Sequence, residues 1–427
     1  MKNTRPPRWS RLDNAAKIFP SNSSKADSKV FRFSCELNER VDPVILQSAL
    51  DRTIEQFPFY RSVMKQGLFW YYFEDSDLEV VVSAEDKPPC LPLYSAERRS
   101  LLFRVYYYDR RISLEIYHAL TDGTGALQFL CTLVYYYLLA CHPADFWEAV
   151  PELNYGASQS QKWDDSFQKY YQKPEDMPAV PRISWKRKAY HLRGERMPAR
   201  RLAVIEGRMS LKALLACSRE RGVTLTELQV ALLICSIHEG MRLRDCSRPV
   251  VITVPVNLRG FFPSESVRNF FATVNISYDF SRQADSLEAV LCHVKQSLRE
   301  NLTREKLRRR MNMLCALEHN IPMRIVPLPA KDPVLRIANY VSNRQVTASF
   351  SNVGRVTMPA EMERYIRQFG VFSSPNKLQA SACSFLDHYV VSFAGPFYHH
   401  DVERVFFRRM VQLGIDVEIT TNLTRTE

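Results

Sequence analysis

The sequence predicts an α/β (α+β layered) fold of two lobes, each with a mixed sheet flanked by helices. The chain has 427 residues, which suits two domains of roughly 200 residues each or one large bilobed fold. Short β-rich segments and amphipathic helices follow one another in an order typical of mixed sheets. Prolines and clustered charges interrupt this order in the middle of the chain. We therefore expect a first lobe over 1–150, a crossover over 151–200 and a second lobe over 201–427.

The first lobe is expected to combine strands with two helices. In chain order these are strand 30–37, helix 42–58, short strands 60–65, 68–74 and 78–83, hairpin strands 101–108 and 112–120, and helix 126–141. Pro43 in the first turn and Pro58 past the end mark the limits of the first helix. The apolar stretch 126–141 is short for a bilayer and contains three tyrosines, so it predicts a buried helix and no membrane span.

The second lobe is expected to repeat this mixture. Its predicted elements are strand 201–209, helices 210–222 and 223–240, strands 249–257 and 271–280, helix 285–318, strands 346–353 and 383–394, helix 401–413 and strand 415–421. Thr224 and Glu227 have the spacing of a capping box ahead of the second helix. No short-period repeat accompanies these elements.

The charge balance indicates an anionic partner. There are 58 Lys and Arg residues against 46 Asp and Glu, a net charge of +12, which attracts a phosphate-bearing cofactor, an acidic carrier protein or nucleic acid. The strongest basic runs, 185–201 and 304–310, come without zinc-finger spacing or an RNA-binding aromatic signature. We interpret them as solvated faces or mobile loops and expect no nucleic-acid partner.

Cysteine usage and the N-terminus predict a cytoplasmic protein. The ten cysteines lie mostly in apolar stretches and form no C-x-x-C pair, as is typical of reduced, buried thiols in a cytosolic protein. The opening residues lack the apolar core of a signal peptide.

One histidine stands out because it ends a predicted strand. Strand side chains alternate between faces, so His118 continues the apolar face of Leu114 and Ile116. That position also suits a hydrogen-bonded core histidine. However, "TDGTG" follows it at 121–125, and the strand, turn and helix predicted there place a side chain at a cleft edge, near helix N–H groups that suit an anionic ligand.

His118 at this corner is a candidate general base. A neutral imidazole in a cleft takes a proton from an alcohol or amine as that group attacks a carbonyl. No G-x-S-x-G elbow and no cysteine with a suitable local signature supplies a nucleophile. No second His or Cys stands at ligand spacing from His118, so we expect no metal.

The motif "HALTDG" at 118–123 resembles the H-x-x-x-D-G motif of the CoA-dependent acyltransferase superfamily. This superfamily includes chloramphenicol acetyltransferase, plant BAHD acyltransferases, peptide-synthetase condensation domains and bacterial alcohol acetyltransferases. Residues 254–271 are similar to its second-lobe segment, where V-(N/D)-x-R precedes an asparagine and an aromatic by some ten residues. The opening "RWSRLD" resembles the bacterial alcohol acetyltransferase group and would lie near the cleft.

The resemblance implies two similar chloramphenicol-acetyltransferase-like lobes and a role for each motif residue. His118, Asp122 and Gly123 would form the catalytic motif, with Asp122 structural and paired to Arg259. The segment 350–354 resembles the strand end that faces the histidine, which makes Ser351 and Asn352 candidate oxyanion donors. The plant D-F-G-W-G motif is absent, and Tyr117 stands where condensation domains usually carry a second histidine.

These residues lead to the hypothesis of a CoA-dependent O-acyltransferase. Acetyl-CoA or another acyl-CoA would be the co-substrate and a small alcohol or amine the acceptor, with direct attack and no metal. Three alternatives stay open. They are a condensation-like enzyme that uses an acyl carrier protein, a catalytically silent binding protein of the same fold, and a nucleic-acid binder, for which steep salt dependence would be diagnostic.

Overall fold

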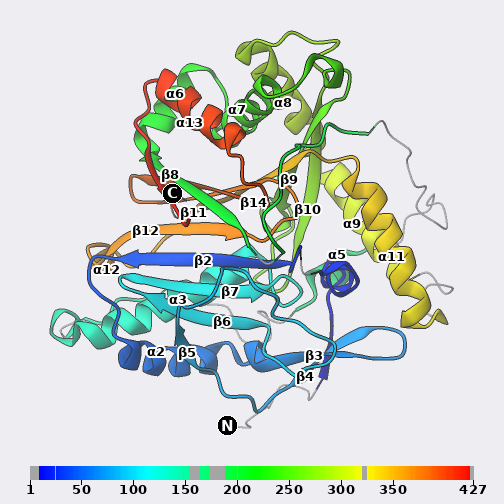
Figure 1. Cartoon of the computed structure of the whole chain (residues 1–427). Coiled ribbons are helices and arrows are strands. Elements are labelled where there is room, and N and C mark those ends of the chain that lie inside the picture. The colour runs from blue at the N-terminus through cyan, green and yellow to red at the C-terminus, as the bar shows by residue number, and fades with distance from the viewer. Residues whose placement is uncertain are drawn as a thin grey trace.

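The computed structural model describes residues 9–24, 26–147, 149–153, 164–172, 188–199, 201–319 and 325–423. Within these ranges the chain forms two large mixed sheets and one small sheet, with helices on the outer sides of the large sheets (Figure 1). The mixed α/β architecture predicted from the sequence is confirmed. Much of the predicted crossover 151–200 lies outside the described residues; its described part includes α5 (Ser166–Tyr170).

The first large sheet has the order β12-β2-β7-β6-β5. Its strands are β2 (Val30–Leu37), β5 (Val82–Ala84), β6 (Phe103–Tyr108), β7 (Arg111–Tyr117) and β12 (Ile366–Ser373). Only the β5–β6 pair is parallel. Helices α2 (Pro43–Gln56) and α3 (Gly123–Cys141) belong to the same layer. Asp42 caps α2 by accepting from the N–H groups of Val44 and Ile45.

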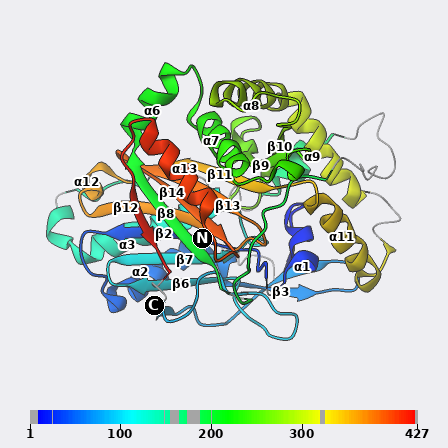
Figure 2. The same ribbon diagram turned by 45° about the horizontal axis from the view of Figure 1, so that its top comes forward.

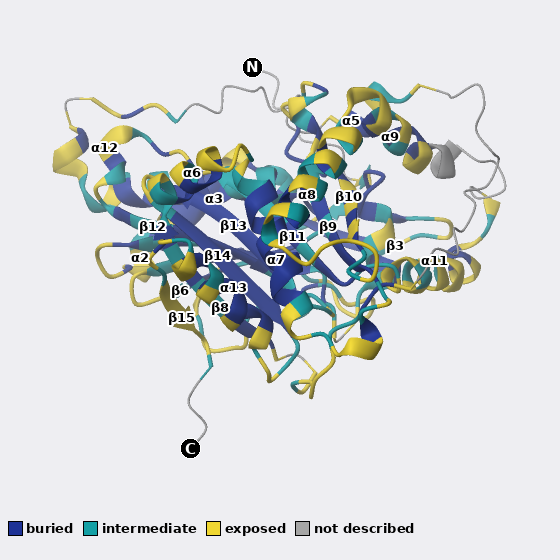
Figure 3. Cartoon of the chain, turned by 90° about the horizontal axis from the view of Figure 1, so that it is seen from above, coloured by how far each residue is buried: buried dark blue, intermediate teal, exposed yellow. Residues whose placement is uncertain are grey.

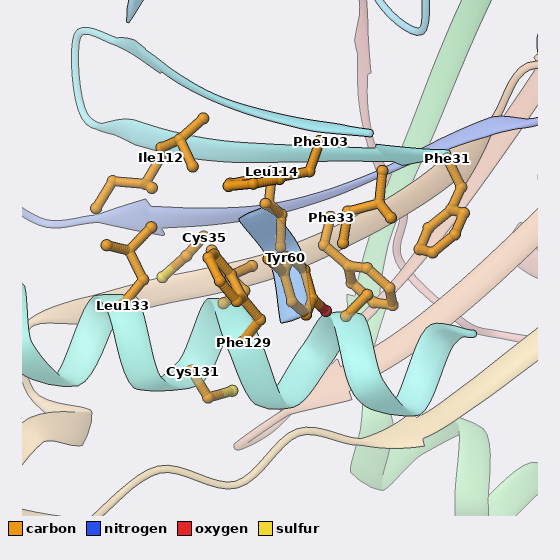
Figure 4. Packing of buried hydrophobic residues seen from close by; sticks show 14 of the residues in the cluster. Phe31, Phe33, Cys35, Tyr60, Phe103, Ile112, Leu114, Phe129, Cys131 and Leu133 are labelled. Atoms are coloured by element: carbon orange, nitrogen blue, oxygen red, sulfur yellow. The ribbon is translucent and has the colours of Figure 1, made fainter. Parts of the chain in front are cut away.

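The core between this sheet and α3 consists of interdigitated apolar side chains (Figure 4). Phe33 from β2 and Leu114 from β7 point toward the helix, and Phe129 from α3 stacks on Tyr60 with ring centroids 4.3 Å apart. Among the described residues, α3 is the one helix long and apolar enough to cross a membrane, and 56% of that stretch is buried. It is the buried helix expected from the sequence.

The second large sheet has the order β10-β9-β11-β13-β14-β8-β15. Its strands are β8 (Ala203–Ser210), β9 (Val250–Asn257), β10 (Phe271–Tyr278), β11 (Ala348–Arg355), β13 (Gln379–Phe385), β14 (His388–Gly395) and β15 (Glu418–Thr421). Helices α6 (Leu211–Glu220), α7 (Leu225–Glu239), α8 (Leu287–Asn301) and α13 (Asp401–Gln412) accompany it. Seen from above, the central strands are dark blue beneath helices with yellow outer faces (Figure 3). The predicted capping box of Thr224 and Glu227 begins α7.

The small sheet and the remaining helices surround these layers. The small sheet has the order β1-β4-β3, with β1 (Trp9–Arg11), β3 (Ser62–Gln66) and β4 (Tyr71–Asp75). The other helices are α1 (Phe19–Asn22), α9 (Arg304–His319), α11 (Leu328–Asn343) and α12 (Ala360–Glu363). Short 3₁₀ turns lie at 16–18, 58–61, 143–146, 243–245 and 258–260. α1 lies beside α11 (Figure 2).

Two predicted elements were each wrong in one respect. The predicted helix 285–318 is interrupted at residues 302 and 303, where Thr303 accepts from the N–H of Lys306 and starts a new helix. The predicted strand 383–394 is the hairpin of β13 and β14, which turns at Leu386, in the left-handed region with φ +51°, and Asp387. Continuous apolar character concealed this turn. α11 and β12 were not predicted.

The predicted boundary at residue 201 needs one correction. β12 comes from the second half of the chain but pairs antiparallel with β2 over Ile366–Ser373, so it belongs to the first sheet. Backbone N–H and C=O groups at the free edge of β2 need partners, and β12 supplies them. The second half of the chain therefore contributes one strand to the first sheet, and a division of the chain at 201 does not divide the sheets.

Candidate active site

His118 lies immediately after β7, at the end of the strand as predicted. Its N–H donates to the carbonyl of Lys29 at 2.8 Å, which continues the β2–β7 ladder by one residue. The side chain lines a cavity of about 610 Å³. β2 and β12 form one side of this cavity, and β9, β10, β11 and β13 contribute to the other. His118 therefore faces the space between the two large sheets.

Aromatic rings surround the imidazole of His118. Phe19 stacks on it with centroids 4.7 Å apart, Phe31 meets it edge-on at 5.0 Å, and Phe271 is tilted at 5.5 Å. Burial among these rings lowers the pKa of His118 below its usual 6.5, although a hydrogen bond to its own backbone, the Asp122 carboxylate and the hydrogen bond to Asn269 oppose this shift. The imidazole is neutral at neutral pH, which is the state a general base requires.

A hydrogen bond to Asn269 determines which nitrogen of His118 carries the proton. Nδ1 lies 3.2 Å from Oδ1 of Asn269. The Nδ2 of this amide donates to Asp13 at 3.2 Å, so Oδ1 is the atom that faces the histidine. A carbonyl oxygen only accepts, and therefore Nδ1 is the protonated nitrogen and Nε2 keeps its lone pair. The arrangement can accept a proton at Nε2.

Asp122 caps α3 and does not touch His118. Its Oδ1 accepts from the N–H groups of Thr124 and Gly125 at 3.1 and 3.2 Å. Its Oδ2 accepts from the N–H of Phe270 at 2.9 Å and from Arg259 at 2.7 Å. A carboxylate at a helix N-terminus also interacts favourably with the helix dipole. Asp122 thus stabilises the turn that carries His118.

The ion pair between Asp122 and Arg259 that the resemblance implied is present. The two side chains are 7% and 11% exposed. Arg259 also donates to the carbonyls of Ser266 and Arg268 at 2.7 and 2.6 Å. One guanidinium therefore joins α3 to the loop before β10, which carries Asn269. The Asp122–Arg259 pair therefore connects the two lobes and positions Asn269, which contacts His118.

Of the two glycines in "TDGTG", Gly125, which follows the motif, is the one that the packing requires. A Cβ on Gly125 would lie 2.2 Å from both Thr121 Oγ1 and the carbonyl oxygen of Val267, whereas a Cβ on Gly123 would meet only Phe33, at 3.8 Å. Neither glycine has a positive φ. The close backbone approach expected at this turn occurs at Gly125, and Gly123 lines the cavity.

The two candidate oxyanion donors lie on opposite sides of β11. Ser351 lines the cavity together with His118. Asn352 instead donates from Nδ2 to Thr226 Oγ1 at 3.0 Å and accepts from the N–H of Gly354 at 3.0 Å. Because strand side chains alternate, the two residues cannot both face the cavity. The structure brings Ser351 to the site and leaves Asn352 in contact with α7.

Asn269 and Asp13 are the site residues to which the sequence alone assigned no role. Asn269 is the asparagine after the V-(N/D)-x-R element, and Asp13 ends the "RWSRLD" opening, so both lay inside motifs already singled out. Their contacts join positions 256 residues apart, which no local pattern reveals. Across the described ranges, no group of three or more His, Cys, Asp or Glu residues could hold a metal ion.

Comparison with solved structures places this site in a known architecture. TRI101 of F. sporotrichioides, crystallised with coenzyme A and T-2, is 13% identical with a TM-score of 0.63, over 96% of this chain and 99% of that one. Polyketide synthase associated protein 5 of Mycobacterium tuberculosis is 14% identical with a TM-score of 0.61, over 95% and 96%. The chain has the CoA-dependent acyltransferase fold.

A condensation domain is also among the solved structures that share this fold. The first condensation domain of the CDA synthetase is 12% identical with a TM-score of 0.58, over 95% of this chain and 97% of that one. No family model matches the sequence, and no curated protein matches it significantly. At such identities the likeness establishes the acyltransferase fold, and the chemistry has to be argued from this chain's own residues.

Replacing Arg259 by Gln is expected to destabilise the protein by about 3–5 kcal/mol, because the buried Asp122 carboxylate loses its charged partner. Arg208→Gln is the matched control, since Arg208 pairs with Glu418, whose side chain is 54% exposed, and exposed pairs contribute about 0–1 kcal/mol. Urea unfolding measures both free energies. Equal losses in the two variants would contradict a special role for the Asp122–Arg259 pair.

The two glycines of "TDGTG" are expected to respond differently to alanine. Gly125→Ala should destabilise the protein by about 1–3 kcal/mol, because its Cβ would overlap the Val267 carbonyl. Gly123→Ala should change stability by less than about 0.5 kcal/mol. Thermal unfolding of both variants tests whether Gly125 is the glycine that the packing requires. A Gly123→Ala variant less stable than Gly125→Ala would contradict this.

Proposed function

We propose that this protein is an acyltransferase that moves an acetyl or longer acyl group from a CoA thioester to an alcohol or amine by direct attack. The observation that carries this proposal is the placement of His118 in the cavity, with Nδ1 3.2 Å from Oδ1 of Asn269, because this contact leaves Nε2 free to act as a base. The cavity beside it is of a size typical of small-molecule sites.

The reaction is proposed to pass through a tetrahedral intermediate without a covalent enzyme intermediate. Nε2 of His118 takes the proton of the acceptor hydroxyl or amine as that atom forms a bond to the thioester carbonyl carbon. The hydroxyl of Ser351 donates to the oxyanion that develops. When the intermediate collapses, the C–S bond breaks and the thiolate receives the proton from His118, which returns to its neutral state.

A group of cations beside the cavity supports an anionic donor. We call Arg196, Arg344 and Lys377 the cationic rim; all three line the cavity, as does His191, whose pKa is lowered by burial and by nearby cations. They lie together, because Arg196 donates to Asn376 and His191 lies within hydrogen-bond distance of the Arg344 carbonyl. Burial and the neighbouring cations lower the pKa of Lys377 to about 8. Clustered positive charge of this kind suits the phosphates of CoA.

A carrier-bound donor is the second candidate. The cationic rim would also suit an acidic carrier-protein surface, and the structures similar to this chain include a condensation domain and a protein described as polyketide synthase associated. Tyr117, rather than a second histidine, precedes the motif. This difference favours free acyl-CoA as the donor.

Free-thiol release from acetyl-CoA, measured with a panel of alcohols and amines, tests the proposal. His118→Ala should lower acceptor-dependent release by about 10²–10⁴-fold, because it removes the base. His399→Ala is the control, since His399 is exposed and does not line the cavity. A His118→Ala protein as active as the wild type would overturn the mechanism. No release with any acceptor, together with activity on an acyl carrier protein, would establish the second candidate instead.

The pH dependence of kcat/KM is expected to reflect the lowered pKa of His118. The neutral imidazole is the active form, so activity should fall as the pH drops, with a midpoint below 6.5, the usual histidine pKa. A ¹⁵N NMR titration of His118, with the resonance identified by its loss in His118→Ala, follows the same group directly. A titration midpoint at or above 6.5 would contradict the assigned environment.

A further inference from the structure

The N-terminal segment, residues Trp9–Asn22, forms part of the wall around His118. Its β1 pairs with β4 of the small sheet, and its α1 lies beside α11 (Figure 2). Phe19, the first residue of α1, stacks on the imidazole of His118. Asp13 lies in this stretch and is only 1% exposed. A buried carboxylate so close to the proposed base needs an explanation.

Both oxygens of Asp13 are used. Oδ1 accepts from the N–H of Ala16 at 2.7 Å. Oδ2 accepts from Asn269 twice, from the backbone N–H at 3.3 Å and from the side-chain Nδ2 at 3.2 Å. Arg268 is the nearest cation, with Nε 3.8 Å from Oδ2. Burial raises the pKa of Asp13 to about 6, so the carboxylate is ionised at neutral pH and only accepts.

This carboxylate decides the orientation of the Asn269 amide. An amide that turned around would place its oxygen against the Asp13 oxygen and its NH₂ against Nδ1 of His118. Asp13 excludes that orientation, because two acceptors would then meet in a buried site. The amide oxygen is thereby left for Nδ1–H of His118 at 3.2 Å.

We propose that Asp13 is a positioning residue for His118, acting through Asn269 to keep the proton on Nδ1 and leave Nε2 as the base. This inference rests on the proposed function in one respect, the role of Nε2 as the base; the effect of Asp13 on the tautomer does not depend on it. It also makes the N-terminal segment a required part of the site, since docking of this segment brings both Asp13 and Phe19 to the histidine.

The variant Asp13→Asn separates this role from simple packing. It has almost the same shape, but it must point an NH₂ group either at the two donors of Asn269 or at the N–H of Ala16. By turning around, the Asn269 amide can relieve the side-chain part of the first conflict, and only the backbone N–H of Asn269 still faces the new NH₂ group. The NH₂ of Asn269 would then face Nδ1 of His118, which would have to become an acceptor, and the proton would move to Nε2. A histidine in that state lacks the lone pair that the reaction needs.

Nitrogen-15 NMR of histidine-labelled protein without substrate measures the tautomer directly, at about pH 8, where both groups have lost their protons. We expect Nδ1–H in the wild type and a shift toward Nε2–H in Asp13→Asn. Asp245→Asn is the matched control, because Asp245 is also a buried carboxylate beside an arginine, 3.1 Å from Arg193, and lies outside the cavity. It should leave the His118 tautomer unchanged.

Kinetics provide the second readout. Asp13→Asn should lower kcat by about 10–10²-fold with little change in KM, because substrate contacts remain. In a double-mutant cycle with Asn269→Ala, the Asp13 substitution should add almost nothing, since the residue through which it acts is gone. If the losses of kcat in Asp13→Asn and Asn269→Ala instead multiply in the double variant, the two residues act independently. Asp13 would then have a purely structural role, and the proposal would be overturned.

The two readouts distinguish this inference from the proposed function. If His118 is not the base, kcat in the double-mutant cycle carries no information about Asp13. The His118 tautomer measured by NMR still tests whether Asp13 positions the imidazole. A wild-type His118 with its proton on Nε2 would overturn the inference, and so would a tautomer that is unchanged in both Asp13→Asn and Asp13→Ala. Circular dichroism checks that each variant folds. Asp13→Ala frees the Asn269 amide without adding a new donor, so His118 in this variant should be a mixture of the two tautomers. If Asp13→Asn does not fold, Asp13→Ala alone tests the inference, and an unchanged Nδ1–H form would refute it.

Discussion

The Asp122–Arg259 ion pair is the interaction on which the rest of this structure depends. A single carboxylate accepts from the first turn of α3, from the N–H of Phe270 and from a guanidinium of the other lobe. Both charges are almost fully buried, so water cannot replace either partner. The pair joins the end of one sheet to the beginning of a strand in the other, where the candidate active site lies.

The site is consequently built from three separate parts of the chain. The first lobe supplies His118, the loop held by Arg259 supplies Asn269, and the N-terminal segment supplies Asp13 and Phe19. None of these parts contains a complete site. The environment that keeps the imidazole neutral and its Nδ1 protonated exists only after the lobes and the segment have assembled.

The pairing of β12 with β2 limits how the two lobes can move. Its pairing with β2 runs from Phe31 to Leu37, so the second half of the chain completes the first sheet. Seven residues of ladder would have to break before the lobes could separate as independent bodies. The cavity between the sheets is therefore bounded by one continuous structure, which favours a site whose geometry is largely formed before substrate binds.

The sequence by itself determined the features that depend on neighbouring residues. Strand alternation and the glycine turn located His118, unbroken apolar character located α3, and the resemblance carried by "HALTDG" pointed to Asp122 and Arg259. Tertiary structure decided the placement of β12, the side of β11 that Asn352 faces, and the chain of contacts from Asp13 to His118. The physical reason is range: periodicity and capping act over a few residues, whereas these contacts form between positions whose separation in sequence is overcome only by folding.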